Sequence, residues 1–358
     1  MARAVKLAAR GLYTTDPNPR VGCVLAHGAD VVGEGYHKRA GGPHAETVAL
    51  AAAGERARGA TAYVTLEPCS HHGRTPPCVD ALLAAGVARV VYAMRDPNPR
   101  VNGGGIDRLL KAGVDVTGGV LEAMARALNP GFLSRMERGR PWLRLKLASS
   151  LDGRTALAGG ESRWITGEWA RNDVQRLRAR SSAILTGAGT VLNDDPRLNV
   201  RLPGATRQPL RVVLDAELDV PPAARVFVPP GEALVMTASG DAVRAGRLVA
   251  AGVRVETVRR DGTGLDLQAV MARLAELEVN ELHVECGATL AGSLLSAGLI
   301  DELVVYMAPT LLGEGARPLM AIGALASMAD RPRLEIVDMR RVGGDLKLVL
   351  RPETTGGN

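Results

Sequence analysis

The sequence predicts an α/β protein with two domains. Its 358 residues are enough for two hydrophobic cores, and strands alternate with helices in both halves. The alternation stops between about 129 and 141, where Asn129-Pro130-Gly131 and a basic stretch ending at Pro141 predict a connector. We therefore expect an α/β/α sandwich over residues 1–139 and a doubly wound domain over residues 140–358.

Elements of the first half follow from periodicity and from glycine and proline breaks. A helix is expected over 1–11, ended by Gly11. Strands are expected at 21–26, 31–34, 61–66 and 88–93, and further helices at 44–53, 78–85 and 106–112.

The second half shows a longer alternation of the same kind. Its β-branched runs predict strands at 142–148, 183–186, 210–214, 233–236, 253–257, 281–285 and 302–308. Helices are expected at 168–180, 265–277 and 289–297, and the tail from 353 onward is expected to be disordered.

Composition excludes several classes of protein. Apolar residues make up 46% of the chain, and no apolar run approaches the length of a membrane span. The first ten residues indicate an amphipathic helix rather than a signal peptide. Four unevenly spaced cysteines do not suggest a disulfide framework. We expect a cytoplasmic protein with reduced thiols and no membrane partner.

Net charge is modestly basic, at +6. Residues 1–138 hold 17 Lys and Arg against 12 Asp and Glu, so most of the surplus, +5, lies in the first half. A small anionic substrate such as a phosphate ester fits this surplus. No Lys/Arg run or aromatic stacking platform supports a nucleic-acid partner.

The motif with the clearest chemistry is His44-Ala45-Glu46, followed by Pro68-Cys69 and by Cys78. One histidine and two cysteines are zinc ligands, and three protein ligands leave a fourth position open, as in catalytic sites. H-x-E followed by P-C and a second cysteine is the signature of zinc deaminases, in which the glutamate carries protons and does not bind the metal. We expect one catalytic zinc held by His44, Cys69 and Cys78, with Glu46 as acid and base.

Alternatives remain at this motif. His71 or His72 as a fourth ligand would make the zinc structural. The eight residues between Cys69 and Cys78 exceed the usual C-x-x-C spacing, so we interpret them as specific to the substrate. A hexapeptide at 16–21 recurs at 96–101 as a rigid turn, and its first copy is placed to present the Asn18 amide to a ligand.

The second half lacks a G-x-G-x-x-G fingerprint. Glycine turns at 186–190 and 285–292 are the alternatives, because free N–H groups at a helix start can hold a phosphate. Arg178 and Arg201 are candidate phosphate ligands. His283 is interpreted as a strand residue without a special role.

Several runs together resemble one family, the bifunctional riboflavin-biosynthesis enzymes that combine a pyrimidine deaminase with a reductase. The resemblance covers nearly the whole chain. The runs are Pro17-Asn18-Pro19, Gly33-Glu34-Gly35-Tyr36-His37, Pro43-His44-Ala45-Glu46, Thr65-Leu66-Glu67-Pro68-Cys69, the stretch from Cys69 to Cys78, Ser150-Leu151-Asp152-Gly153-Arg154-Thr155, Trp164-Ile165-Thr166 and Asn193-Asp194-Asp195-Pro196.

This resemblance implies a cytidine-deaminase-like first domain and a second domain similar in fold to dihydrofolate reductase. The first would deaminate 2,5-diamino-6-ribosylamino-4(3H)-pyrimidinone 5′-phosphate at C2. The second would use NADPH to reduce the ring-opened ribose at C1′. The assembly would be a homo-oligomer, with a dimer favoured.

The resemblance also implies contact residues. Those for the deaminase substrate are Asn18, His37, His71 and Arg74. Those for the reductase substrate are Lys146, Ser162, Arg178, Leu198, Arg201 and Glu285. Those for the cofactor are Ala148, Trp164, Thr190, Asp194, Ala216, Gly287, Ala288, Thr289, Leu290, Ala291, Gly292 and Ser293.

Two rival functions remain open from the sequence. One is a deaminase of the same fold that acts on a free nucleotide or on tRNA, which leaves the second domain unexplained. The other is a non-enzymatic scaffold stabilised by zinc, which would lose its metal only on unfolding.

Overall fold

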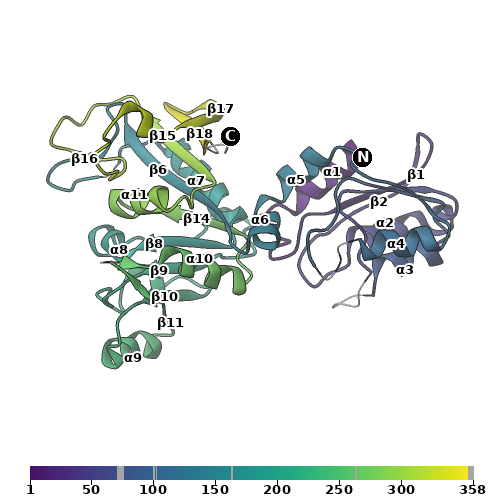
Figure 1. Cartoon of the computed structure of the whole chain (residues 1–358), viewed down its shortest axis with the longest axis horizontal. Helices are drawn as coiled ribbons and strands as arrows, with labels where there is room; N and C mark the ends of the chain where they lie inside the picture. The colour runs from purple at the N-terminus through teal and green to yellow at the C-terminus, as the bar shows by residue number, and fades with distance from the viewer. Residues whose placement is uncertain (71–75, 100, 102, 163, 263, 354–358) are drawn as a thin grey trace. The chain divides into compact units, whose positions relative to one another are not determined.

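The computed structural model describes residues 1–70, 76–99, 101, 103–162, 164–262 and 264–353 (Figure 1). The chain divides into two compact units, Met1–Arg140 and Pro141–Asn358. Among the described residues, no helix is long and apolar enough to cross a membrane.

The first unit contains a five-stranded sheet of order β2-β1-β3-β4-β5. β1 pairs antiparallel with β2 and β3, and the last three strands are parallel. The strands are β1 (Gly22–His27), β2 (Asp30–Tyr36), β3 (Thr61–Val64), β4 (Arg89–Tyr92) and β5 (Asp115–Thr117).

Helices cover both faces of this sheet, as the predicted sandwich requires (Figure 1). One face packs against α2 (Ala45–Ala53), α3 (Cys78–Ala84) and α4 (Gly104–Lys111). On the other face lie α1 (Ala2–Ala8) and α5 (Glu122–Leu128). Short 3-10 turns follow α1 at Ala9–Gly11 and α2 at Gly54–Ala57.

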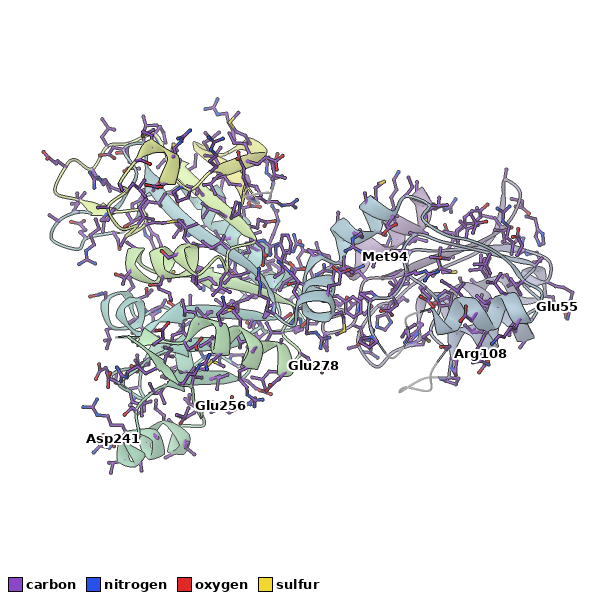
Figure 2. All side chains as sticks on the ribbon, viewed as in Figure 1. Glu55, Met94, Arg108, Asp241, Glu256 and Glu278 are labelled. Atoms are coloured by element: carbon purple, nitrogen blue, oxygen red, sulfur yellow. The ribbon has the colours of Figure 1, made fainter. Side chains whose placement is uncertain are left out.

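The predicted connector is wrong in part, because most of it is the helix α6 (Pro130–Arg138). Proline is well suited to the first position of a helix, where its missing N–H is not needed. Gly139, at φ 66°, ends the helix in the left-handed conformation. Phe132 and Leu133 of α6 are buried with Met94, which Figure 2 labels, so α6 belongs to the core of the first unit.

The second unit contains a nine-stranded sheet of order β11-β10-β9-β8-β14-β6-β15-β18-β17. The first seven of these run parallel, and β18 and β17 form an antiparallel hairpin at one edge. They are β6 (Trp142–Ser150), β8 (Ala183–Gly187), β9 (Leu210–Leu214), β10 (Ala233–Thr237), β11 (Arg254–Thr257), β14 (Glu281–Glu285), β15 (Glu302–Ala308), β17 (Leu334–Val342) and β18 (Asp345–Pro352).

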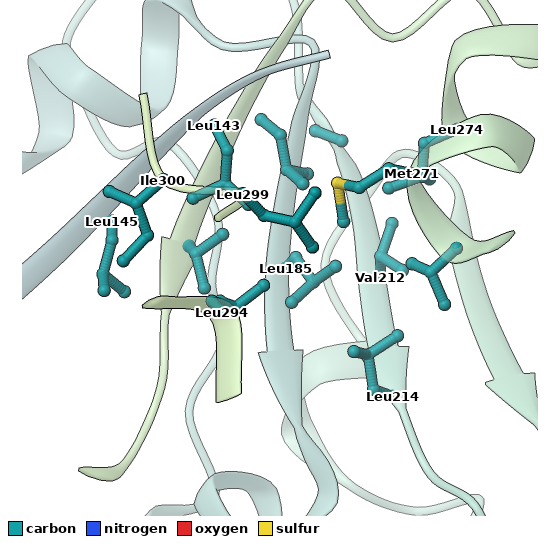
Figure 3. Packing of buried hydrophobic residues seen from close by; sticks show 14 of the residues in the cluster. Leu143, Leu145, Leu185, Val212, Leu214, Met271, Leu274, Leu294, Leu299 and Ile300 are labelled. Atoms are coloured by element: carbon teal, nitrogen blue, oxygen red, sulfur yellow. The ribbon is translucent and has the colours of Figure 1, made fainter. Parts of the chain in front are cut away.

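Alternate residues of the parallel strands point to opposite faces, and each face has its own helices. Leu185 and Val212 face α10 (Leu267–Glu276) and α11 (Ala288–Ser296), where Figure 3 shows them with Met271, Leu274 and Leu294. The opposite face packs against α7 (Glu168–Arg180), α8 (Ala188–Asp194) and α9 (Ala242–Ala250). This is the predicted doubly wound arrangement.

The remaining elements of the second unit are short. They are β7 (Arg154–Ala156) paired with β16 (Arg317–Pro318), β12 (Arg260–Asp261) paired with β13 (Gly264–Leu265), and 3-10 turns at Arg225–Phe227 and Met328–Asp330. Of the tail predicted to be disordered, Glu353 donates its backbone N–H to the Arg333 carbonyl oxygen at 3.0 Å, and residues 354–358 lie outside the described residues.

Candidate active sites

The structure brings His44, Cys69 and Cys78 together in the first unit. His44 is the N-cap of α2, Cys78 is the first residue of α3, and Cys69 lies in the loop after β3. Nδ1 of His44 is 3.2 Å from Sγ of Cys78 and 3.5 Å from Sγ of Cys69. All three ligand atoms lie within 4.8 Å of one another. One imidazole nitrogen and two sulfurs at this spacing fit a tetrahedral zinc ion.

Hydrogen bonds prepare Cys69 for a metal. The Cys78 thiol hydrogen-bonds to the Cys69 sulfur and lowers the pKa of Cys69 to about 4, although burial opposes this shift. The backbone N–H of Cys78 also donates to Cys69 Sγ, at 3.3 Å. Cys69 is therefore a thiolate, which is the form that binds a metal.

Glu46 lies in the first turn of α2, beside the three ligands but outside their cluster. Its side chain is only 4% exposed, and burial raises the pKa of Glu46 to about 6. A carboxyl group with this pKa can take and return a proton near neutral pH, as general acid–base chemistry requires.

The position of α2 depends on two glycines in β2. A Cβ atom on Gly33 would lie 2.3 Å from the Ala49 carbonyl oxygen, and one on Gly35 would lie 2.3 Å from that of Ala45. Only glycine allows this approach, so Gly35 sets where the first turn of α2 meets the sheet.

Asn18 and His37 form one polar unit beside the ligands. The amide nitrogen of Asn18 donates to Nε2 of His37 at 3.1 Å, and Nδ1 of His37 donates to the Pro43 carbonyl oxygen at 3.0 Å. Burial lowers the pKa of His37, which keeps it neutral in this tautomer. Its ring lies edge-on to His44 with 5.5 Å between centroids. His71, His72 and Arg74 lie outside the described residues.

Glu67 is a supporting residue that the sequence analysis did not single out. Its buried carboxylate accepts backbone N–H bonds from Asp96, Gly103, Gly105 and Ile106, at 3.1 to 3.4 Å. These bonds tie the start of α4 and the second hexapeptide to the residue two positions before Cys69. The feature of the sequence that could have indicated Glu67 is its position directly before the Pro68-Cys69 pair.

A cavity of about 1660 Å³ lies at the carboxyl ends of the parallel strands of the second unit. Ligands bind in open α/β sheets at this end. All but one of the predicted reductase residues line it. These are Lys146, Ala148, Ser162, Trp164, Arg178, Thr190, Asp194, Leu198, Arg201, Ala216, Glu285, Gly287, Ala288, Thr289, Leu290, Gly292 and Ser293.

Ala291 is the exception, since it is not among the residues that line the cavity, and its contact with the cofactor stays a prediction. Its side chain is fully buried in the core with Leu294. The helical period turns this position of α11 toward the sheet while residues 287–290 face the cavity.

Arg178 and Glu285 form a bidentate ion pair at the cavity wall. Nε of Arg178 is 2.6 Å from one carboxylate oxygen of Glu285, and Nη2 is 3.0 Å from the other. Nη1 of Arg178 also donates to the Asn199 carbonyl oxygen at 3.1 Å. Three of the five N–H donors of Arg178 thus bind protein groups, which leaves Arg201 better placed than Arg178 to bind phosphate.

His283 has a role that the sequence analysis did not predict. It is fully buried in β14, and its Nε2 lies 3.1 Å from Oε1 of Glu285. Burial lowers the pKa of His283, so the neutral ring donates this hydrogen bond. Burial opposes ionisation of Glu285, but Arg178 and His283 outweigh it and hold the pKa of Glu285 well below its usual range.

Lys146 faces Glu285 from the adjacent strand, since the two residues are partners in the β6–β14 register. Burial lowers the pKa of Lys146, and the charge of Glu285 acts against that shift. The cavity therefore presents an ammonium group and a carboxylate side by side on two neighbouring strands.

The rim of the cavity has an exposed aromatic side chain and two residues with positive φ. Trp164 is 71% exposed with the Arg171 guanidinium 4.6 Å from its ring centroid, so it is not a core residue. Leu198 has φ 46° and Asp195 has φ 41°, an unusual backbone conformation for residues with side chains. Such conformations gather at ligand-binding loops.

Comparison with known proteins identifies the family. Residues 141–348 match the family described as RibD C-terminal domain. Residues 1–94 match the cytidine and deoxycytidylate deaminase zinc-binding region. The riboflavin biosynthesis protein RibD of Escherichia coli (strain K12) is 53% identical over 362 residues, which cover 98% of each chain. The chain belongs to the RibD family.

Other RibD proteins agree along the whole length. RibD of Haemophilus influenzae is 47% identical over 99% of this chain and 96% of its own. The structure of Acinetobacter baumannii RibD, form 1, matches with TM-score 0.92 and 45% identity, covering 99% and 98% of the two chains. Membership of the RibD family confirms the predicted fold class and the two activities, deaminase and reductase, of riboflavin biosynthesis. It also confirms zinc and NADPH as cofactors, and the scaffold alternative is therefore wrong.

Proposed function

We propose that residues 1–139 deaminate 2,5-diamino-6-ribosylamino-4(3H)-pyrimidinone 5′-phosphate and that residues 140–358 then reduce its ribosyl chain, giving 5-amino-6-(5-phosphoribitylamino)uracil. The observation that carries this proposal is the convergence of His44, Cys69 and Cys78 beside the buried carboxyl group of Glu46. A Thermotoga maritima structure with 34% identity and TM-score 0.86 is described as a diaminohydroxyphosphoribosylaminopyrimidine deaminase and 5-amino-6-(5-phosphoribosylamino)uracil reductase, over 98% of this chain and 97% of its own.

In the deaminase, His44, Cys69 and Cys78 hold the zinc. When bound, zinc makes a water molecule acidic enough to attack a ring carbon at neutral pH. Glu46 would take one proton from the attacking water and give it to the ring nitrogen, and would then pass the remaining hydroxyl proton to the amino group, which leaves as ammonia while the ring carbonyl forms. Asn18 and His37 orient the pyrimidine, and His71 and Arg74 complete the contacts with the substrate.

In the reductase, NADPH supplies the hydride, and the protein supplies orientation and charge. Lys146 and Glu285 lie together at the cavity floor, where they hold the ring-opened ribose. Arg201, with Ser162 and Leu198, holds the substrate phosphate end, while Arg178 fixes Glu285. The cofactor lies along Ala148, Trp164, Thr190, Asp194 and Ala216 and over the start of α11 at Gly287.

Partners and location complete the proposal. The substrate is a small phosphorylated pyrimidine, with no nucleic acid and no membrane involved. We place the protein in the cytoplasm as a homodimer. The location is based on the four cysteines, all of them described residues, none of which is in a disulfide bond: Cys23, Cys69, Cys78 and Cys286.

Metal analysis of the purified chain tests the first half of the proposal. We expect one zinc per chain, and a lower metal content after Cys69→Ser or Cys78→Ser. Cys23→Ser, which removes a buried thiol outside the ligand cluster, should keep the zinc. Equal zinc contents in all the cysteine variants would contradict the ligand assignment.

NADPH binding tests the second half of the proposal. Gly287→Val should weaken NADPH binding without changing the zinc content.

A further inference from the structure

His283 is a buried ionisable residue that the proposed reaction does not use. Its side chain is fully buried in β14, where its neighbours on the adjacent strands are Arg144 of β6 and Ile184 of β8. Nε2 lies 3.1 Å from Oε1 of Glu285. Nδ1 is also buried, and it has no hydrogen-bond partner among the described residues. A buried polar atom without a partner is rare in proteins, so packing alone does not account for a histidine at this place.

The surroundings of His283 determine where its ring carries a proton. A neutral imidazole has one N–H group and one acceptor nitrogen. A proton on Nδ1 would be a buried donor without an acceptor, and it would turn the lone pair of Nε2 toward the carboxylate of Glu285. Burial, together with the positive charges of Arg178 and Arg144, lowers the pKa of His283 and disfavours a second proton, although Glu285 acts against this shift. The proton therefore lies on Nε2 and is donated to Glu285.

The two carboxylate oxygens of Glu285 differ in the donors that they receive from the described residues. Oε1 receives two, from Nε of Arg178 at 2.6 Å and from Nε2 of His283 at 3.1 Å. Oε2 receives one, from Nη2 of Arg178 at 3.0 Å. Each oxygen of an ionised carboxylate has two lone pairs, so Oε1 is saturated and Oε2 keeps one lone pair for a further donor. Because Glu285 lines the cavity, this lone pair is available to a ligand.

We propose that His283 is a positioning residue of the reductase, which acts through Glu285. Together with Arg178 it occupies Oε1, so that Oε2 accepts a hydrogen bond from a hydroxyl group of the ring-opened ribose. The ionised carboxylate then binds and orients the sugar chain without giving up a proton. A ligand that lacks this hydroxyl group is rejected, because the acceptor built to meet it stays unpaired. This inference rests on the proposed contact between Glu285 and the substrate.

Lys146 supplies a donor next to this acceptor. It is the partner of Glu285 in the β6–β14 register, and both residues line the cavity. Its ammonium nitrogen lies 6.0 Å from the ring centroid of the buried Tyr306, on the neighbouring strand β15. An ammonium donor beside a carboxylate acceptor matches two oxygen atoms of an open sugar chain, of which one accepts and the other donates a hydrogen bond. The floor of the cavity therefore favours a ligand with hydroxyl groups.

Steady-state kinetics of the full-length enzyme, with the deaminated substrate and NADPH, tests the role of His283. His283→Phe keeps a ring but removes the donor, and the KM of the substrate should rise on the order of 10-fold, since a hydrogen bond to a charged group is worth about this factor or more. The kcat of reduction and the Kd of NADPH should stay near the wild-type values, because the contact of Oε2 is made alike before and during hydride transfer. His283→Gln, whose amide nitrogen takes the place of Nε2, should restore the KM. The matched control is Ile184→Val, which removes a buried methyl group beside His283 and should leave the KM unchanged.

The outcomes separate this inference from the proposed function. A wild-type KM in His283→Phe, or a raised KM that His283→Gln does not restore, would overturn the role of His283. Glu285→Gln tests the contact beneath it, and a wild-type KM in that variant would instead overturn the proposed contact between Glu285 and the substrate.

Nitrogen NMR of the full-length protein with labelled histidine tests the state of the ring without any reaction. The resonances of His283 are assigned by their absence from the spectrum of His283→Gln. We expect a neutral ring with its proton on Nε2 at neutral pH. A charged ring, or a proton on Nδ1, would contradict the hydrogen bond from His283 to Glu285 and with it the inference.

Discussion

The two sites of this chain are built in opposite ways. The first is a compact cluster of side chains from two helix starts and one loop, with its ligand atoms within 4.8 Å of one another. The second is a cavity of about 1660 Å³ to which many strand ends contribute. The first site depends on the positions of three ligand atoms and one carboxyl group. The second depends on buried charged residues behind the cavity wall, such as the Arg178–Glu285 ion pair. Substitutions should therefore lower the deaminase rate or the zinc content in the first site, and the stability of the fold in the second.

The largest expected effect is on deamination by Glu46→Gln. The amide cannot carry the proton, so the deaminase rate should fall by about 10²–10⁴, the usual contribution of general acid–base catalysis. Zinc content should stay at the wild-type value, because Glu46 is not among the ligands. Ammonia release and metal analysis check this, with reduction of the deaminated substrate as the control. Loss of zinc would mean that Glu46 has been given the wrong role.

A loss of stability should follow from Arg178→Ala in the second site. Glu285 would remain buried without its partner, and breaking a buried ion pair costs about 3–5 kcal/mol. The matched control is Arg176→Ala on the same helix, where the arginine is 66% exposed and the cost should be about 0–1 kcal/mol. Urea unfolding measures both. Equal effects would show that the buried layer does not support the cavity.

A smaller effect is expected from Gly35→Ala in the first site. The new methyl group would overlap the Ala45 carbonyl oxygen, and overpacking of this kind costs about 1–3 kcal/mol. The shift of α2 should also reduce zinc content, since His44 precedes Ala45. Gly246→Ala in α9 meets no atom within 4 Å and should be neutral or slightly stabilising. Unchanged zinc content in Gly35→Ala would contradict the role of this contact.

The smallest effect concerns acid stability of the second unit. Burial opposes ionisation of Asp173, but hydrogen bonds from Lys347 and Tyr306, both at 2.6 Å, lower its pKa below the usual value. The carboxylate therefore stabilises the fold above its unfolded pKa of about 3.9, and this contribution is lost as pH falls through the lower folded pKa. Asp173→Asn should flatten the pH dependence of unfolding in that acid range. Parallel curves for the variant and the wild type would exclude this contribution.

Sequence alone predicted the first site better than the second for a physical reason. The zinc ligands lie in short contiguous runs, and their residue types are typical of a zinc deaminase. Predicting them therefore needed no information on tertiary structure. Arg178, His283 and Glu285 meet only because α7 lies across β14, and strand alternation cannot show what faces a residue. Arg178, which the sequence suggested as a phosphate ligand, pairs with Glu285 in the structure.

Missed elements have local explanations. Pro130 looked like a break in the chain, yet proline at the first helical position begins α6. β17 shows no clean alternation because a bulge falls between Ile336 and Asp338, so consecutive apolar residues and mixed charges hide the strand. The resemblance gave a continuous cofactor loop that includes Ala291, and the helical geometry of α11 turns the side chain of this residue toward the core.

One measurement tests the central claim, that a single chain carries out two reactions in a fixed order. Ammonia release and NADPH oxidation are followed together with the diaminopyrimidine substrate and the full-length enzyme. We expect one ammonia and one NADPH per substrate, with ammonia released even when NADPH is left out and no NADPH oxidised when Glu46→Gln replaces the wild type. Oxidation of NADPH by the Glu46→Gln enzyme at the wild-type rate, without release of ammonia, would contradict the account.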